Sequence, residues 1–129
     1  MISWRVEVQV SKGEKYPKGW DTQADDCFFP DYDHQEFLLP FFDVGDEIID
    51  ECGLTVFHVS DLQRLEKRLA SYLKIFAATS EEWSVRSTMW GKSSQIHIQR
   101  SVVLELIEKT LNMARYAISI NGTMEFFGD

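Results

Sequence analysis

Two stretches of the chain repeat hydrophobic residues at helical spacing, and they constrain the fold more than any other feature of the sequence. The first stripe consists of Leu62, Leu65, Leu69, Tyr72, Leu73 and Phe76. With Ser60 and Gln63 matching a capping box before it, this spacing predicts an amphipathic helix over residues 61–77. The second stripe consists of Val103, Leu104, Ile107, Leu111, Ala114 and Ile118 and predicts a helix over roughly residues 100–118. Each helix needs an apolar surface on which to pack.

Other segments have the alternation or composition of strands. Apolar and polar side chains alternate from residue 2 to residue 10, which predicts a half-buried strand. Residues 53–59 are rich in β-branched and aromatic types and predict a second strand, and residues 83–90 are a further candidate. Residues 20–35 read as irregular, whereas residues 36–42 read as extended, with Pro40 restricting them to an edge or bulged strand.

The pair Asn121-Gly122 allows two interpretations. It fits a type I′ hairpin turn between residues 117–120 and 123–127. It also fits a left-handed end of the second helix, followed by a short final strand. The second interpretation is favoured because the helical stripe continues to Ile118.

These elements predict one domain over residues 1–129, which is an ordinary length for a single domain. The strands cluster early and do not alternate regularly with helices. This order favours the α+β class, with a mostly antiparallel sheet and two main amphipathic helices packed on it, over a doubly wound fold. No apolar window is long enough for a membrane span, and the charged N-terminal residues do not resemble a signal peptide. We therefore expect a cytoplasmic protein in which Cys27 and Cys52 are free thiols.

The distribution of charge is uneven. The net charge is −8, and residues 21–51 hold eleven of the twenty-one acids and no lysine or arginine. The remainder of the chain has ten acids against thirteen bases. An acidic field of this kind repels nucleic acid and anionic membranes and attracts cationic surfaces. Neither nucleic acid nor a membrane is therefore an expected partner.

Motifs for catalysis, metals and cofactors are weak. The three histidines lack the i, i+4 spacing of a zinc-binding helix. Asp31, Asp33 and Glu36 resemble a calcium loop that lacks its glycine and its final glutamate. The sequence Gly91-Lys92-Ser93 lacks the rest of a P-loop. We expect no enzyme activity, no metal and no cofactor.

The acidic segment itself is the main functional candidate, and it has two explanations. In the structural one, its phenylalanines belong to the core and its acids line the solvated side of loops. In the functional one, the mutual repulsion of the acids is relieved by a cationic partner, with aromatic side chains as anchors. The predicted partner-binding surface spans residues 20–47. Its contacts are Trp20, Asp25, Asp26, Asp31, Tyr32, Asp33, Asp43, Asp46 and Glu47.

The C-terminal part of the chain carries a resemblance to a known group. Residues 111–118, followed by Gly122 and by Phe126-Phe127-Gly128-Asp129, are similar to the closing helix and strand of small immunity proteins of bacterial toxin systems, including contact-dependent growth inhibition. Small size and acidity add to the resemblance. It implies a cytosolic bacterial protein that binds one cognate toxin domain, often a nuclease, and catalyses nothing. No binding residue can be carried over from that group.

The sequence therefore predicts an immunity-type inhibitor that binds a cationic toxin domain through its acidic surface, by presenting carboxylates where the toxin holds phosphates. Another protein-interaction or adaptor module is an open alternative. A small-ligand-binding protein or an enzyme is a third, and a deep apolar pocket with converging polar groups would favour it.

Overall fold

The computed structural model describes residues 1–8, 10–15, 26–87 and 94–129. In chain order its elements are β1 (Ser3–Glu7), β2 (Cys27–Phe28), α1 (Tyr32–Phe42), β3 (Leu54–Phe57), α2 (Val59–Ala77), β4 (Glu82–Ser87), β5 (Ser94–Gln99), α3 (Arg100–Ser119) and β6 (Thr123–Phe127). Within those residues, no helix combines the length and the apolar character that crossing a membrane requires.

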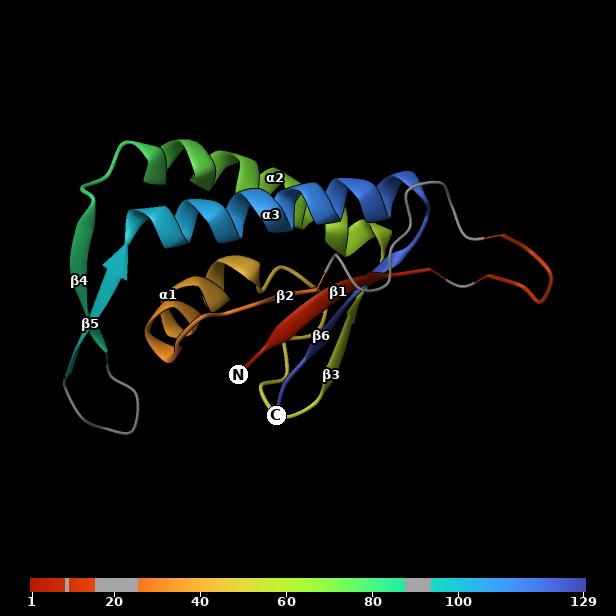
Figure 1. Ribbon diagram of the computed structural model, residues 1–129, viewed down its shortest axis with the longest axis horizontal. Helices are drawn as coiled ribbons and strands as arrows, with labels where there is room; N and C mark the ends of the chain where they lie inside the picture. The colour runs from red at the N-terminus through yellow and green to blue at the C-terminus, as the bar shows by residue number, and fades with distance from the viewer. Residues whose placement is uncertain (9, 16–25, 88–93) are drawn as a thin grey trace.

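The strands form two antiparallel sheets. The larger sheet has the order β2-β1-β6-β3, and β4 and β5 form a separate hairpin. Helices α2 and α3 lie side by side on one side of the larger sheet, and α1 lies beneath them, next to the hairpin (Figure 1). The fold is thus α+β with helices packed on a sheet, which confirms the predicted class.

Alternation along the strands separates the two faces of the larger sheet. Trp4 on β1, Phe57 on β3 and Phe126 on β6 are almost completely buried on the face toward the helices. Their rings contact one another: the centroid of Phe126 lies 5.9 Å from that of Trp4 and 4.8 Å from that of Phe57. The Trp4 indole also donates a hydrogen bond to the buried Thr110 hydroxyl on α3, at 3.1 Å. The strand predicted over residues 2–10 is confirmed, although it is shorter than expected.

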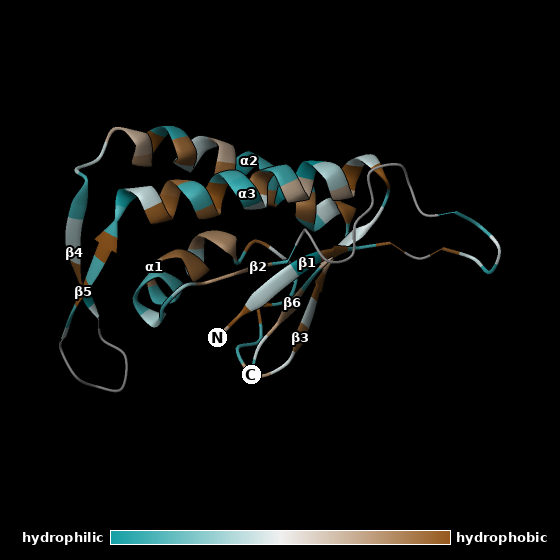
Figure 2. Ribbon diagram, viewed as in Figure 1, coloured by the Kyte–Doolittle hydropathy of each residue, from teal (hydrophilic) through white to brown (hydrophobic). Residues whose placement is uncertain are grey.

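The two long helices confirm the predicted stripes, with Leu69 on α2 and Ile107 on α3 both fully buried. Hydrophobic and hydrophilic residues alternate along both helices (Figure 2). The predicted cap of α2 is wrong. The helix begins two residues earlier, with His58 as its N-cap, and the carboxylate of Asp61 accepts a hydrogen bond from the His58 backbone N–H at 3.0 Å. Asp61 therefore takes the role that the sequence assigned to Gln63.

The helix α1 corrects the expectation that residues 20–35 are irregular and that residues 36–42 are extended. Asp31 caps this helix by accepting a hydrogen bond from the His34 backbone N–H at 2.8 Å. A buried face formed by His34, Gln35, Leu38 and Phe42 then has helical spacing. Pro40 is tolerated near the C-terminal end, where its missing N–H removes a single intrahelical bond. Figure 2 shows that α1 is hydrophilic at its beginning and hydrophobic toward its end.

The end of α3 confirms the favoured interpretation of Asn121-Gly122. Asn121 has a φ of 53°, in the left-handed region. Its N–H donates to the carbonyl of Ile118 at 3.1 Å, and the N–H of Gly122 donates to the carbonyl of Ala117 at 2.8 Å. This pair of bonds is a Schellman motif, and β6 follows it directly.

The hairpin β4–β5 joins the ends of the helices through an aromatic cluster. The ring of Trp83 on β4 lies 5.7 Å from Phe37 on α1 and 6.1 Å from Phe76 on α2. The strand predicted over residues 83–90 is present up to residue 87, and residues 88–90 lie outside the described part of the chain.

Candidate functional site

Most of the predicted partner contacts gather near the two ends of α1. Trp20 and Asp25 lie outside the residues that the structure describes. Asp26, Asp31, Tyr32 and Asp33 lie at or before the beginning of the helix, whereas Asp43, Asp46 and Glu47 follow its end. An eleven-residue helix is roughly 16 Å long, so the segment that looks like one acidic feature in the sequence is two separate groups in the fold.

The first group is largely used for internal contacts. Besides capping α1, Asp31 lies 2.8 Å from the Nδ1 atom of the buried His34 ring, and the other ring nitrogen, Nε2, accepts a hydrogen bond from the Gln99 backbone N–H at 3.1 Å. Asp33 accepts from the His97 backbone N–H at 3.1 Å. These carboxylates fasten the beginning of α1 to the hairpin, which is a structural role.

The electrostatics of Asp31 agree with this role. Partial burial acts to raise the pKa of its carboxyl group, but hydrogen bonds from the His34 backbone and ring outweigh it, and the pKa is lowered below its usual value. The carboxylate is therefore held in its charged form by the fold.

Tyr32 and Asp26 are the members of the first group that remain available. The Tyr32 side chain is 62% exposed. Asp26 is exposed. Lys109 on α3 donates a hydrogen bond to its backbone carbonyl at 3.1 Å, whereas its carboxylate has no partner among the described residues.

The second group belongs to the loop between α1 and β3. Asp43 accepts a hydrogen bond from the Ile49 backbone N–H at 2.8 Å, and Asp50 accepts one from the Cys52 backbone N–H at 2.8 Å. The Thr55 hydroxyl of β3 in turn accepts from the Asp50 backbone N–H at 2.8 Å. The loop therefore has a defined conformation and lies against the beginning of β3.

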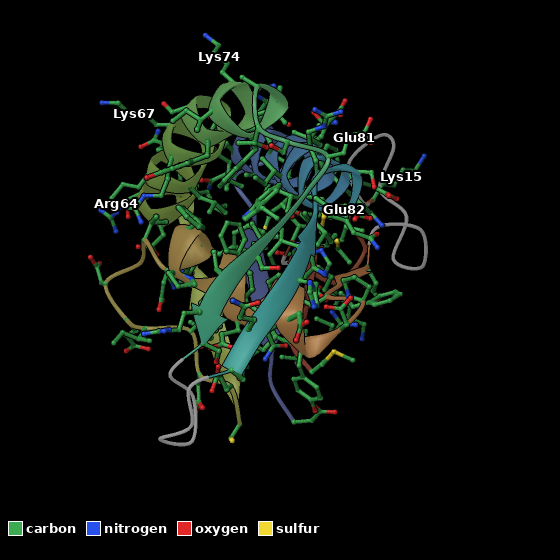
Figure 3. All side chains as sticks on the ribbon, turned by 90° about the vertical axis from the view of Figure 1, so that its left-hand side faces the viewer. Lys15, Arg64, Lys67, Lys74, Glu81 and Glu82 are labelled. Carbon is green, nitrogen blue, oxygen red and sulfur yellow. The ribbon has the colours of Figure 1, made fainter. Side chains whose placement is uncertain are left out.

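A base from α2 reaches this loop, although no base is present in its own sequence. Arg64 contacts Asp46 at 3.1 Å and the buried Asp61 at 2.5 Å, and it donates to the Val44 carbonyl at 3.0 Å. Figure 3 shows Lys67 on the same helix pointing away from the body of the molecule. Arg64 thus compensates part of the negative charge of the loop, a feature that the linear charge map could not reveal.

The carboxylates of the loop that remain free line the same groove as two exposed hydrophobic side chains. Within the described residues, Glu47 and Glu51 make no hydrogen bond or ion pair, and both are exposed. Ile48 is 80% exposed and Leu54 is 55% exposed. All four line one open groove of about 740 Å³. We call these four residues the acidic loop patch.

Sequence reasoning found Glu47 but missed Glu51, Ile48 and Leu54. In the fold Ile49 is buried and Ile48 is exposed. The adjacent pair Ile48-Ile49 does not indicate which side chain is buried, so only the fold identifies Ile48.

The cysteines differ in environment. Cys27 on β2 is buried and Cys52 in the loop is exposed, and the two are not bonded to each other. Burial raises the pKa of the Cys27 thiol above its ordinary value, because the charged thiolate loses its solvation. In the described part of the chain, no cluster of three or more histidine, cysteine or carboxylate side chains is arranged to hold a metal ion.

Comparisons of the chain with protein-family models, with curated proteins and with solved structures find no match. The function is therefore inferred from the residues and contacts of the chain itself.

Proposed function

We propose that this protein binds a basic protein partner through the acidic loop patch. The observation that carries the proposal is that two carboxylates without a described partner, Glu47 and Glu51, line one groove together with the exposed Ile48 and Leu54. Exposed hydrophobic side chains surrounded by charge are typical of protein interfaces, in which the apolar groups supply most of the affinity and the charges form a polar rim.

The charges of the patch have a second effect. A net charge of −8 attracts a cationic partner over distances of the order of the Debye length, about 8 Å at physiological salt. Steering of this kind raises association rates and makes them sensitive to ionic strength. The predicted binding is therefore faster at low salt, whereas its apolar part persists at high salt.

The specific form of the proposal is an immunity-type inhibitor of a cationic toxin domain, and a nuclease is the preferred class of toxin. A nuclease holds phosphates with basic side chains, and carboxylates such as those of Glu47 and Glu51 would occupy the same positions. The acidity of the chain and the resemblance of residues 111–129 to immunity proteins support this form.

The structure changes which substitutions test the proposal. Neutralising Asp31 and Asp33 together is the test that the charge map suggests, but both carboxylates stabilise the fold. The better variant is the double substitution Glu47→Gln and Glu51→Gln, because neither carboxylate has a described partner to lose. Glu105→Gln on α3 is the matched control, since Glu105 is exposed and lies outside the patch.

The experiment begins with basic domains encoded next to this chain, which are expressed and tested for binding. The affinity for such a domain is then measured at low and at high ionic strength. We expect the double variant to bind more weakly at low salt and to show a flatter salt dependence, and the control to behave like the wild type. Unchanged affinity of the double variant at both ionic strengths would contradict the proposal.

A further inference from the structure

The larger sheet has a face turned away from the helices that none of the described helices or strands covers, and this open face carries a row of hydrophobic side chains. Ser3 on β1 is paired with Phe28 on β2 and with Phe127 on β6, and Phe127 is paired in turn with Leu54 on β3. Because paired residues of neighbouring strands point to the same face, these four residues form one line across all four strands. We call them the open-face row.

The two outer members of the open-face row are exposed, and Ser3 and Phe127 between them are partly buried. Phe28 is 64% exposed and Leu54 is 55% exposed, whereas their strand neighbours Cys27 and Thr55 are buried on the opposite face. Single exposed hydrophobic residues are common on protein surfaces. Here the strand register places two phenylalanines and a leucine in one line across the sheet, with a small serine between the rings. We call this line the strip.

Charged residues border the strip on the same face. Arg5 lies with its guanidinium carbon 4.8 Å from the centre of the Phe127 ring, and its Nε atom is 2.7 Å from Glu7. Glu125 is paired with Arg5 across the strands. Arg5, Glu7 and Glu125 all line a second groove, which has a volume of about 950 Å³. Asp26 lies beside Phe127 in a smaller hollow. Among the described residues that line these two hollows, the border has three carboxylates, Glu7, Glu125 and Asp26, with one arginine and no lysine.

We propose that the open face of the sheet is the apolar part of the docking surface, and that its occupant is a protein segment with hydrophobic side chains flanked by lysine or arginine. This inference rests on the proposed function. Leu54 belongs both to the open-face row and to the acidic loop patch, so the two surfaces are continuous. The negative border of the face has the same sign as the patch, and it complements the same basic partner.

The open face alone is too small for a stable interface, which supports a docking surface that also includes the acidic loop patch. Four strands spaced about 4.8 Å apart extend about 14 Å, and a five-residue strand is about 16 Å long. The projected area is then about 230 Å², well below the roughly 800 Å² that each side of a standard interface buries. The open face needs the adjoining acidic loop patch to reach the size of a stable interface.

A second copy of this chain is the competing occupant, and charge disfavours it. Two copies face to face would bring their negative borders and their net charges of −8 together. Like charges in opposition at an interface oppose association. A basic partner relieves this repulsion and a second copy increases it.

The test uses the full chain and two synthetic peptides of equal length, one alternating lysine with leucine and the other alternating lysine with serine. Their affinities are measured for the wild type, for Phe28→Ser, for Leu54→Ser and for the double variant Glu47→Gln with Glu51→Gln. Ile75→Ser is the matched control, because Ile75 is 55% exposed, as Leu54 is, but lies on α2. Urea unfolding of each variant verifies that it is folded.

We expect the lysine–leucine peptide to bind the wild type about tenfold or more tightly than the lysine–serine peptide, which corresponds to about 1.4 kcal/mol. Phe28→Ser and Leu54→Ser should each reduce this preference, and Ile75→Ser should preserve it. Phe28 belongs to the open-face row and not to the acidic loop patch. Equal binding of the two peptides, weakened by the carboxylate variant but not by Phe28→Ser, would overturn this inference and leave the proposed function standing.

Two further outcomes separate the remaining possibilities. A leucine preference that depends on Phe28 but is unaffected by the carboxylate variant would support the open face and contradict the proposed function. A concentration-dependent dimer in analytical ultracentrifugation that Phe28→Ser abolishes would overturn the inference, because it would assign the face to a second copy.

Discussion

Asp61 holds the beginning of α2 and the acidic loop together, so its removal should lower the free energy of unfolding substantially. Its carboxylate is buried and accepts hydrogen bonds from the His58 backbone N–H at 3.0 Å and the Asp46 backbone N–H at 3.3 Å. Arg64 is its ionic partner, at 2.5 Å. Asp61→Ala removes all three contacts at once.

The size of the effect follows from these contacts. A hydrogen bond to a charged group contributes about 1.5–3 kcal/mol, and the loss of a helix cap costs about 1 kcal/mol. Water can reach the exposed His58 and Asp46 in the variant, and the half-exposed Arg64 contributes little. We therefore expect a loss of about 2–4 kcal/mol in total. With a urea m-value of about 2 kcal/mol per M, in the middle of the usual range, the unfolding midpoint should fall by roughly 1–2 M.

Urea unfolding followed by far-UV circular dichroism measures this change. Ser60→Ala is the control, because Ser60 is the cap that the sequence suggests, whereas the structure places it inside α2 and exposed. Its free energy of unfolding should change by less than about 0.5 kcal/mol. A larger loss for Ser60→Ala than for Asp61→Ala would refute the assignment of Asp61 as the capping residue.

Three further predictions concern the core, the thiols and pH. Leu69→Ala and Ile107→Ala should each cost about 2–5 kcal/mol, since both side chains are fully buried; urea midpoints close to that of the wild type would contradict the packing of α2 and α3. In a thiol-reagent assay of the native protein, Cys52 should react quickly and Cys27 should react only after unfolding, because Cys27 is buried and burial raises its thiol pKa. Rapid reaction of both thiols would contradict the burial of Cys27 on β2. The lowered pKa of Asp31 contributes stability above its unfolded value of about 3.9, and this contribution is lost as the pH falls through the folded value. Urea midpoints of Asp31→Asn should accordingly fall less steeply than those of the wild type below about pH 4, and parallel curves would contradict this role.

The long helices and their sheet were predictable because their side-chain periods are unambiguous. The stripe around Leu69 repeats at helical spacing over more than three turns, and the residues of β1 alternate at every position. The residues of α1 have no such signal. Phe37 to Phe42 form a continuous apolar run, which fits a strand as well as a buried helix, and Pro40 argues against a helix. Capping by Asp31 and tertiary packing of the buried face decide the outcome.

The site was less predictable than the fold, since charge in the sequence does not reveal hydrogen bonding. Asp31, Asp33 and Asp43 contribute to the formal charge, but each is engaged as an acceptor within the fold. Arg64 comes from another element and reaches the loop only through the tertiary structure. The acidic segment therefore combines the structural explanation, for these three carboxylates, with the proposed binding role for Glu47 and its neighbours.

Whether the acidic loop patch binds a basic protein can be decided by comparing the wild type with a variant that lacks the two free carboxylates of the patch. The affinity of an identified basic partner domain is measured by isothermal titration calorimetry for the wild type and for Glu47→Gln with Glu51→Gln, at low and at high ionic strength. We expect weaker binding of the variant at low salt and equal affinities of the two proteins at high salt, where screening removes the contribution of the exposed carboxylates. Identical affinities of the two proteins at low salt would contradict it.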